Sequence, residues 1–189
     1  MPTTSRQELY LKTHETMLAE LKAMWEDPMV QLYNDADLPY QLYTGALFLA
    51  GPTSRHQILE CQWRAHAVWL LRRYGFEGWI FCPEPRGVEH DDDLTERSYI
   101  HKWESDRLMS ARHIAFWISR KANELLGLNT NFELGMSVKQ AELDANYRRR
   151  LFVGWPHEAE RMGLPNHYME MARVYRYTSL EELCQSIVK

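Results

Sequence analysis

Short apolar runs that alternate with helical segments constrain the fold of this sequence more than any other feature. Five runs have the length and composition of buried strands: 46–50, 78–82, 113–118, 150–153 and 174–177. Apolar residues at helical spacing occupy the segments between and after them: 56–74, 95–111, from about 130 onward, 166–172 and 179–188. Because such an alternation implies right-handed crossovers, the sequence predicts an α/β fold with a doubly wound parallel sheet of about five strands, covered on both faces.

The first 44 residues lie outside this alternation. We interpret residues 1–44 as an N-terminal helical extension and residues 45–189 as one α/β domain. A helix is predicted from about Arg6 to Trp25, and Pro28 ends its pattern. Three roles fit such an extension: a lid, an oligomer contact, or a helix packed on the outside of the domain.

The composition of the chain excludes several classes of protein. A formal net charge of −4 is unsuited to broad binding of nucleic acid, which needs a basic surface. No apolar run approaches membrane-spanning length, and three cysteines without CxxC spacing are typical of reduced thiols. The polar N-terminus lacks the apolar core of a signal peptide. We therefore expect a cytoplasmic protein that binds neither nucleic acid nor membrane.

Motifs for metals and for common cofactors are absent from the sequence. The eight histidines show neither an HExxH motif nor zinc-ligand spacing. The acidic run 89–93 lacks the spacing of an EF-hand and is interpreted as a solvated loop. A P-loop, a GxGxxG fingerprint and a GxSxG elbow are missing as well. We therefore expect no bound metal.

Glu133 is the leading candidate for a catalytic residue. Parallel α/β sheets bind ligands at the carboxyl ends of their strands, and Glu133 lies in the first turn of the helix predicted after the third run. There the helix dipole favours an ionised carboxylate, which is suited to attack the anomeric carbon of a sugar and form a covalent ester. The segment Thr130–Glu133 also fits an S/T-x-x-E capping box, in which Glu133 would bond only its own helix.

Glu104 is the second candidate. It falls within an apolar stripe of the helix predicted over 95–111 and therefore points toward the sheet, whereas Asp106 lies about 200° away around that helix and faces water. An inward carboxylate costs free energy unless it is paired or functional. Two interpretations stay open: a proton donor to a departing base, or a buried ion pair with an arginine such as Arg55 or Arg120.

The segment 51–55 after the first run combines small residues, hydroxyl groups and an arginine. Gly51 and Thr53 would let a sugar or phosphate approach the backbone, and Arg55 would pair with an anion. A plain turn is the alternative interpretation of this segment.

Four segments, three of which contain residues discussed above, follow one another along the chain: Leu47–Arg55 with Trp63 and Arg64; Phe81–Glu84; Trp103 with Glu104 leading to Ile114–Arg120; and Thr130–Gly135. In this order they resemble the nucleoside 2-deoxyribosyltransferase-like family, over residues 46–156. The resemblance implies a flavodoxin-like sheet and cleavage or exchange of the N-glycosidic bond of a small-molecule nucleoside or nucleotide. It also implies that the protein uses no metal or organic cofactor and forms homo-oligomers, as dimers or larger assemblies.

The resemblance also implies roles for individual residues. Glu133 would be the nucleophile and Glu104 the acid, with Asp106 as the fallback for the acid. The substrate would be bound by residues of the loops and flanking helices: Gly51, Pro52, Thr53, Arg55, Glu84, Trp103, Arg120 and Asn131.

The chain departs from the family pattern at three positions. Arg112 stands where an aspartate usually precedes the third strand, and Ser119 stands where a proline usually precedes its closing arginine. Gly127 stands where characterised transferases carry an aspartate, six residues before the nucleophile. Without that carboxylate, hydrolysis of the bond becomes a rival to base exchange, with Arg55 holding the phosphate of a nucleotide. The same departures fit a non-catalytic module that binds a nucleotide or sugar nucleotide.

Overall fold

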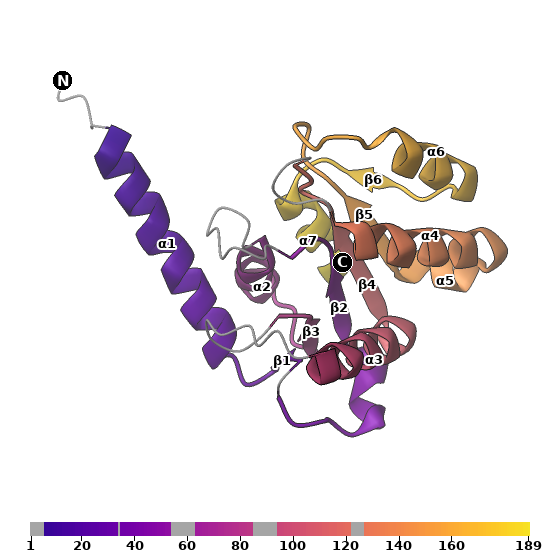
Figure 1. Ribbon diagram of the computed structural model, residues 1–189, viewed down its shortest axis with the longest axis horizontal. Coiled ribbons are helices and arrows are strands. Elements are labelled where there is room, and N and C mark those ends of the chain that lie inside the picture. The colour runs from indigo at the N-terminus through magenta and orange to yellow at the C-terminus, as the bar shows by residue number, and fades with distance from the viewer. Residues whose placement is uncertain (1–5, 34, 54–62, 85–93, 122–126) are drawn as a thin grey trace.

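The structure is a computed structural model and describes residues 6–33, 35–53, 63–84, 94–121 and 127–189. Six strands of the described chain form one all-parallel sheet in the order β1-β3-β2-β4-β5-β6 (Figure 1). The strands are β1 (Val30–Leu32), β2 (Leu47–Ala50), β3 (Ile80–Cys82), β4 (His113–Trp117), β5 (Leu151–Gly154) and β6 (Arg176–Tyr177). The predicted doubly wound α/β fold is confirmed, with flavodoxin-like strand order.

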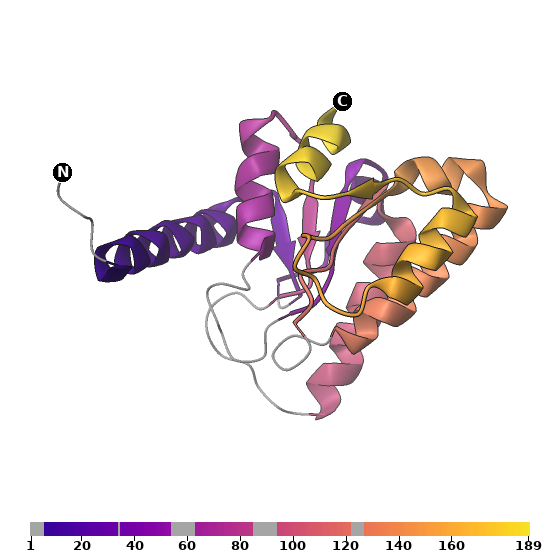
Figure 2. The ribbon, with the colours of Figure 1, turned by 90° about the horizontal axis from the view of Figure 1, so that it is seen from above.

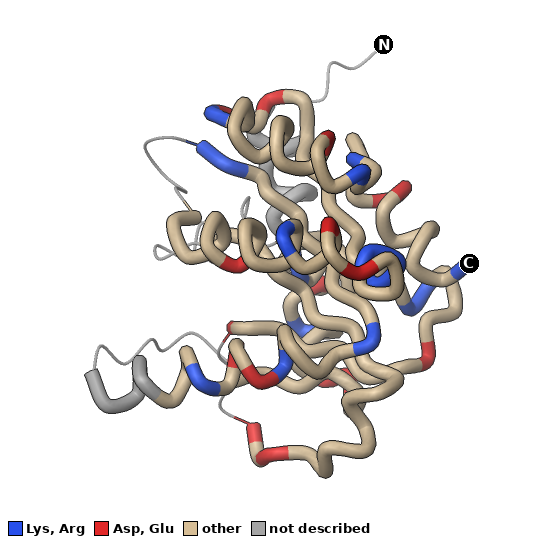
Figure 3. Tube along the Cα trace, turned by 90° about the vertical axis from the view of Figure 1, so that its right-hand side faces the viewer, with Lys and Arg blue, Asp and Glu red and all other residues tan. Residues whose placement is uncertain are grey.

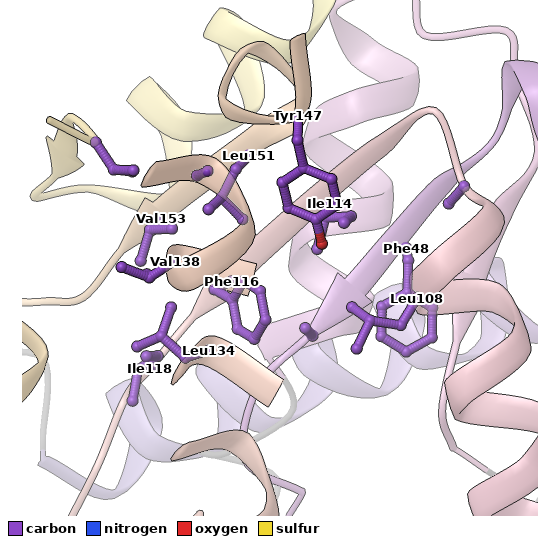
Figure 4. Close-up of a cluster of buried hydrophobic side chains, with 14 of the residues drawn as sticks. Phe48, Leu108, Ile114, Phe116, Ile118, Leu134, Val138, Tyr147, Leu151 and Val153 are labelled. Atoms are coloured by element: carbon purple, nitrogen blue, oxygen red, sulfur yellow. The ribbon is translucent and has the colours of Figure 1, made fainter. Parts of the chain in front are cut away.

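Helices cover both faces of the sheet (Figure 2). The first face carries α3 (Leu94–Ser110), α4 (Leu128–Leu143), α5 (Ala145–Arg150) and α6 (Gly163–Ala172), and the second carries α1 (Arg6–Glu26), α2 (Trp63–Arg73) and α7 (Leu180–Val188). Successive side chains of a strand point to opposite faces. Phe48 and Phe116 therefore enter the first core (Figure 4), while Leu49 and Ala115 enter the second.

The edge strand β1 was not predicted by the apolar pattern. It has three residues, and its middle residue is the polar Gln31. Gln31 is nevertheless buried. Its amide Nε2 donates to the carbonyl oxygen of Ala36 at 2.9 Å, and its Oε1 accepts from Arg107 Nε at 3.3 Å. The first 44 residues thus supply a strand of the sheet as well as α1 and the short 3₁₀ helix η1 (Tyr40–Gly45).

The long helix α1 leaves the domain at its N-terminal end and packs on α2 near its C-terminal end (Figure 1). Met24 is fully buried in this contact region. Glu20 pairs with His66 of α2 at 2.8 Å, and Asp27 pairs with Arg72 of α2 at 2.7 Å. These contacts fasten the last turns of α1 to the second face of the domain.

The remaining elements follow the predicted ones with shifted boundaries. α4 begins at Leu128, two positions before Thr130, and the helical segment predicted from there is divided at Asp144 into α4 and the short helix α5. α7 begins with an N-cap at Ser179, in which the backbone N–H of Glu182 donates to Ser179 Oγ at 3.1 Å. Among the described residues, no helix has the length and apolar character that crossing a membrane requires.

Candidate active site

The loop after β2 fits tightly between the sheet and α2. A Cβ atom on Gly51 would lie 2.4 Å from the carbonyl oxygen of Trp117 and 2.7 Å from the ring of Trp63. Glycine is therefore required at this position. The indole Nε1 of Trp63 donates to the carbonyl oxygen of Pro52 at 3.2 Å. The predicted substrate loop thus has a fixed shape as far as Thr53, where the described part of the loop ends.

A fully buried arginine at the start of α2 anchors this loop. The Arg64 guanidinium donates to the carbonyl oxygens of Leu49 at 3.0 Å and Gly51 at 2.6 Å. It also donates to Thr53 Oγ1 at 3.1 Å and to Glu84 Oε1 at 2.7 Å. One cation thereby joins the segments that follow β2 and β3.

The contacts of Arg64 bear on two residues that the sequence predicts to bind substrate. Glu84 is buried and its charge is balanced directly by Arg64, so its carboxylate holds the loops together. Thr53 is only half-buried. Because Thr53 Oγ1 accepts from Arg64, the hydroxyl hydrogen of Thr53 is directed elsewhere and is suited to donation to a ligand.

Glu104 of α3 and Glu133 of α4 are both partly buried, and they lie near enough to interact electrostatically with each other and with Arg64. Burial raises the pKa of Glu104, while the positive charges of Arg64 and His101 lower it. Burial also raises the pKa of Glu133, to about 7, with a further increase from the charge of Glu104 and a decrease from Arg64. We call these two glutamates with Arg64 and its partner Glu84 the carboxylate group.

The carboxylate group holds three carboxyl groups and one guanidinium. Arg64 pairs directly with Glu84, so Glu104 and Glu133 receive its charge only at a distance. Two neighbouring carboxylates resist ionising together, and burial strengthens that resistance. Near neutral pH the two glutamates therefore share a proton, which is the state required of a site with one nucleophile and one acid.

The start of α4 contradicts the interpretation of Glu133 as part of a capping box. The N-cap residue of α4 is Gly127, and Thr130 is already inside the helix and buried. The capping box predicted over Thr130–Glu133 is therefore wrong, because its threonine does not occupy the cap position. The carboxylate of Glu133 is left to interact with Glu104 across the space between α4 and α3.

Gly127 itself has a backbone that a side chain would strain. Its φ is +60°, in the left-handed region, and a Cβ atom would lie 3.1 Å from the Cβ of Pro52. An aspartate at this position would be both strained and crowded by the loop after β2. The backbone at position 127 therefore does not accommodate the aspartate that the resemblance would place there.

Two other predicted site residues lie outside the carboxylate group. Asp106 is exposed and pairs with Lys102 at 2.6 Å, which leaves Glu104 as the acid candidate of α3. Trp103 is buried in the first core, with the Arg107 guanidinium 4.4 Å from the centre of its ring. Its indole Nε1 has no hydrogen-bond partner among the described residues. Trp103 therefore packs α3 against the sheet.

Arg120 and Asn131, also predicted to bind substrate, pair with each other. An Nη of Arg120 donates to Asn131 Oδ1, and another donates to the carbonyl oxygen of Arg161 at 3.3 Å. Asn131 and Glu133 lie about 200° apart around α4, so Arg120 braces the opposite side of this helix and forms no ion pair with Glu104. Arg55, which was also predicted to bind substrate, lies outside the described residues. The acidic run 89–93 lies outside them as well.

Two residues of the site had no predicted role. Arg64 stands between Trp63 and Ala65, which are both buried, so apolar periodicity could not single it out. His101 lies three residues before Glu104, a spacing that places the two side chains on one helix face. Its Nδ1 is 3.5 Å from Glu104 Oε2, and it approaches from the exposed side of α3.

Comparison of the chain with models of known protein families and with curated proteins finds no match. In the part of the chain that the structure describes, no three histidine, cysteine, aspartate or glutamate side chains are arranged to hold a metal ion. The carboxylate group is therefore the feature from which a function is inferred.

Proposed function

We propose that this protein cleaves or exchanges the N-glycosidic bond of a nucleoside or nucleotide through a covalent glycosyl intermediate on Glu133. The observation that carries the proposal is the convergence of Glu133 and Glu104, two partly buried carboxyl groups with raised pKa values beside one buried cation. Retaining glycosyl chemistry needs such a pair, one member as nucleophile and the other as acid. The proposal includes a cytoplasmic setting, a homo-oligomeric state, and chemistry without metal or organic cofactor.

The ionised Glu133 performs the first step. One of its oxygens attacks the anomeric carbon while the C–N bond to the base breaks, and Glu104 transfers its proton to the departing nitrogen. The step leaves a sugar ester on Glu133, a free base and an ionised Glu104. In the second step Glu104 takes a proton from water or an incoming base, whose oxygen or nitrogen displaces Glu133 from the sugar. Both glutamates then regain their starting protonation states.

Arg64 supports this chemistry through its charge and its hydrogen bonds. Its positive charge lowers the pKa of both Glu104 and Glu133 and so opposes the effect of burial. A pKa of about 7 means that Glu133 takes up and releases a proton near neutral pH beside Glu104, so the pair holds the single proton that the first step needs. The same guanidinium fixes Gly51 and Thr53 in the loop that would receive the sugar.

The acceptor in the second step is water or a second base, and Gly127 favours water. The resembling transferases carry a carboxylate at this position, whereas this chain has a left-handed glycine packed on Pro52. Product analysis separates the two outcomes, because only transfer yields a new nucleoside when a free base is added.

The test is incubation of the full chain with ribonucleosides, deoxynucleosides and their 5′-monophosphates, followed by chromatography of the released base. Glu133→Ala should be inactive, and Glu104→Gln should lose about 10²- to 10⁴-fold in rate. Asp106→Asn, which alters an exposed carboxylate of the same helix, should keep the wild-type rate. A 2-fluoro-sugar nucleoside should leave an adduct on Glu133 that peptide mass spectrometry locates.

Two results would contradict the proposal. Base release by Glu133→Ala at the wild-type rate would remove Glu133 from the mechanism. Nucleotide-dependent thermal stabilisation without release of any base would instead favour a non-catalytic binding module, since a ligand that binds only the folded state raises its stability.

A further inference from the structure

One arginine of α3 is buried together with its charge. Charged residues of both signs follow one another along this helix (Figure 3). Lys102 is exposed and pairs with Asp106 at 2.6 Å, whereas the side chain of Arg107 is only 4% exposed. Burying a cation costs free energy unless an anion and hydrogen bonds compensate it. The groups around Arg107 therefore decide where this part of α3 can lie.

Two side chains of the N-terminal extension bind the guanidinium of Arg107. An Nη donates to Asp37 Oδ1 at 2.7 Å, and Nε donates to Gln31 Oε1 of β1 at 3.3 Å. No second carboxylate pairs with Arg107 in the described ranges of the chain. Asp37 has a side chain that is 68% exposed and stands on the segment between β1 and η1. A buried charge of the α/β domain is thus balanced by an exposed residue of the extension.

Aromatic rings complete the surroundings of Arg107. Its guanidinium carbon lies 4.4 Å from the ring centre of Trp103, 5.2 Å from that of Tyr43 and 5.8 Å from that of Phe81. Tyr43 belongs to η1, and its ring packs edge-on against Phe81 with the ring centres 5.0 Å apart. Cation–π contacts strengthen where water is excluded. Charge and packing together therefore fasten α3 to β1, to the segment after it and to η1.

Arg107 lies one turn beyond Glu104 on the same helix. Residues three apart on a helix are neighbours, and Trp103, which packs against the guanidinium, immediately precedes Glu104. Among the described residues, the ion-pair partner of Glu104 is His101 of the same helix, so the place of Glu104 follows that of α3. A shift of α3 that let water reach an unpaired Arg107 would carry Glu104 with it.

We propose that Asp37 and Arg107 form a latch through which the N-terminal extension sets the position of the acid Glu104. The effect of the latch on catalysis rests on the proposed function, whereas Asp37 lies outside the residues 46–156 that the family resemblance covers. Both latch residues are positioning residues, because they act through Glu104. Without the charge of Asp37, α3 moves to hydrate Arg107 and the acid leaves its place, while the nucleophile Glu133 stays on α4.

Asp37→Asn tests the latch, because it removes the charge and keeps the shape of the side chain. With a nucleoside that the wild type cleaves, kcat should fall by about 10- to 100-fold through misplacement of the acid, with KM unchanged. Glu26→Gln is the matched control. The side chain of Glu26 is 66% exposed, lies in the same extension and pairs with Lys22 at 3.7 Å, so this variant should keep the wild-type rate.

A substrate that needs no acid separates positioning from general damage. A guanine methylated at N7 is already cationic in its nucleoside, and it leaves as a neutral base when the electron pair of the C–N bond moves onto N9. With the 7-methylguanine nucleoside of the sugar that the wild type accepts, Asp37→Asn should keep the wild-type rate. Equal losses with both substrates would overturn the latch, because a smaller fraction of folded enzyme lowers both rates alike.

Two further comparisons test the pairing itself. Asp37→Glu, which keeps the carboxylate, should recover most of the rate with the ordinary nucleoside. Arg107→Met has no buried charge to balance, so adding Asp37→Asn to it should change nothing. A rate difference between Arg107→Met and this double variant overturns the latch, and the comparison also decides the matter if Asp37→Asn alone does not fold.

The titration of Glu104 tests the latch without reference to activity. In ¹³C NMR of the glutamate-labelled chain, with the signal assigned through Glu104→Gln, burial should raise the pKa of Glu104 in the wild type. In Asp37→Asn this pKa should fall toward its ordinary value, because the carboxyl group moves into water, and in Glu26→Gln it should not change. A wild type that releases no base but shows this change overturns the proposed function and supports the latch. A wild type that releases base, with an Asp37→Asn variant that changes neither the rate nor the titration, overturns the latch alone.

Discussion

Replacing Glu133 by glutamine should stabilise the fold at neutral pH while abolishing the proposed activity. Burial and the charge of Glu104 raise the pKa of Glu133 from its ordinary value of 4.5 to about 7. Between these two values the folded state holds a proton that the unfolded chain has released. The free energy of unfolding therefore decreases as the pH rises through this range, and it stays lowered above it.

The magnitude follows from the difference between the two pKa values. At about 1.36 kcal/mol per unit, ionised Glu133 lowers the free energy of unfolding by on the order of 3 kcal/mol at about pH 8, and by less than about 1 kcal/mol at about pH 5. Glutamine keeps the shape of the side chain but has no charge to desolvate. Glu133→Gln should therefore melt roughly 6–12 °C above the wild type at the higher pH, with little difference at the lower pH.

Urea unfolding of the wild type and Glu133→Gln at both pH values, followed by circular dichroism, measures this difference. Asp106→Asn is the control, because Asp106 is exposed. It should change the free energy of unfolding by no more than about 0.5 kcal/mol at either pH. The reasoning is refuted if Glu133→Gln and the wild type are equally stable at the higher pH, or if their difference is independent of pH.

Three other predictions concern the site. Arg64→Met should lower the free energy of unfolding by roughly 3–5 kcal/mol because it leaves Glu84 charged and buried; adding Glu84→Met should recover part of that loss in the same denaturation assay. Gly51→Ala should cost more than about 2 kcal/mol in thermal unfolding, because its Cβ would lie 2.4 Å from the carbonyl oxygen of Trp117. An alanine variant as stable as the wild type would contradict that close approach. For the wild type, kcat/KM should fall as the pH rises through about 7, because the pair of glutamates then loses the last proton, which the departing base must receive, and a flat pH–rate profile across neutrality would count against the proposed pair.

Sequence patterns predicted the elements whose burial is visible in a short window. β2 to β5 are apolar runs buried on both faces of the sheet, so their composition alone marks them. β1 has no such mark, because Gln31 is buried only with the help of Ala36 and Arg107. A three-residue strand of this kind depends on partners that lie elsewhere in the chain.

The features of the site likewise divide into those that a local sequence pattern shows and those that only the tertiary structure sets. Helical periodicity was enough to point Glu104 inward, but its approach to Glu133 depends on how α3 and α4 lie on the sheet, which no local pattern encodes. The capping box at Thr130 was wrong because the helix starts earlier, at a left-handed glycine. Arg64 went without a role because the hydrogen bonds that define it reach residues 11 to 20 positions away.

The position of β1 has a consequence for how this chain can be shortened. Cutting after residue 44 would remove β1 and leave the backbone N–H and C=O groups of Ile80–Cys82 in β3 without their partners on that side. It would also strip Met24 from the apolar surface of the second core. Exposed apolar strand edges pair with edges of other molecules. The fragment 45–189 should therefore aggregate during expression, as light scattering would detect, and a fully soluble monodisperse fragment would contradict this expectation.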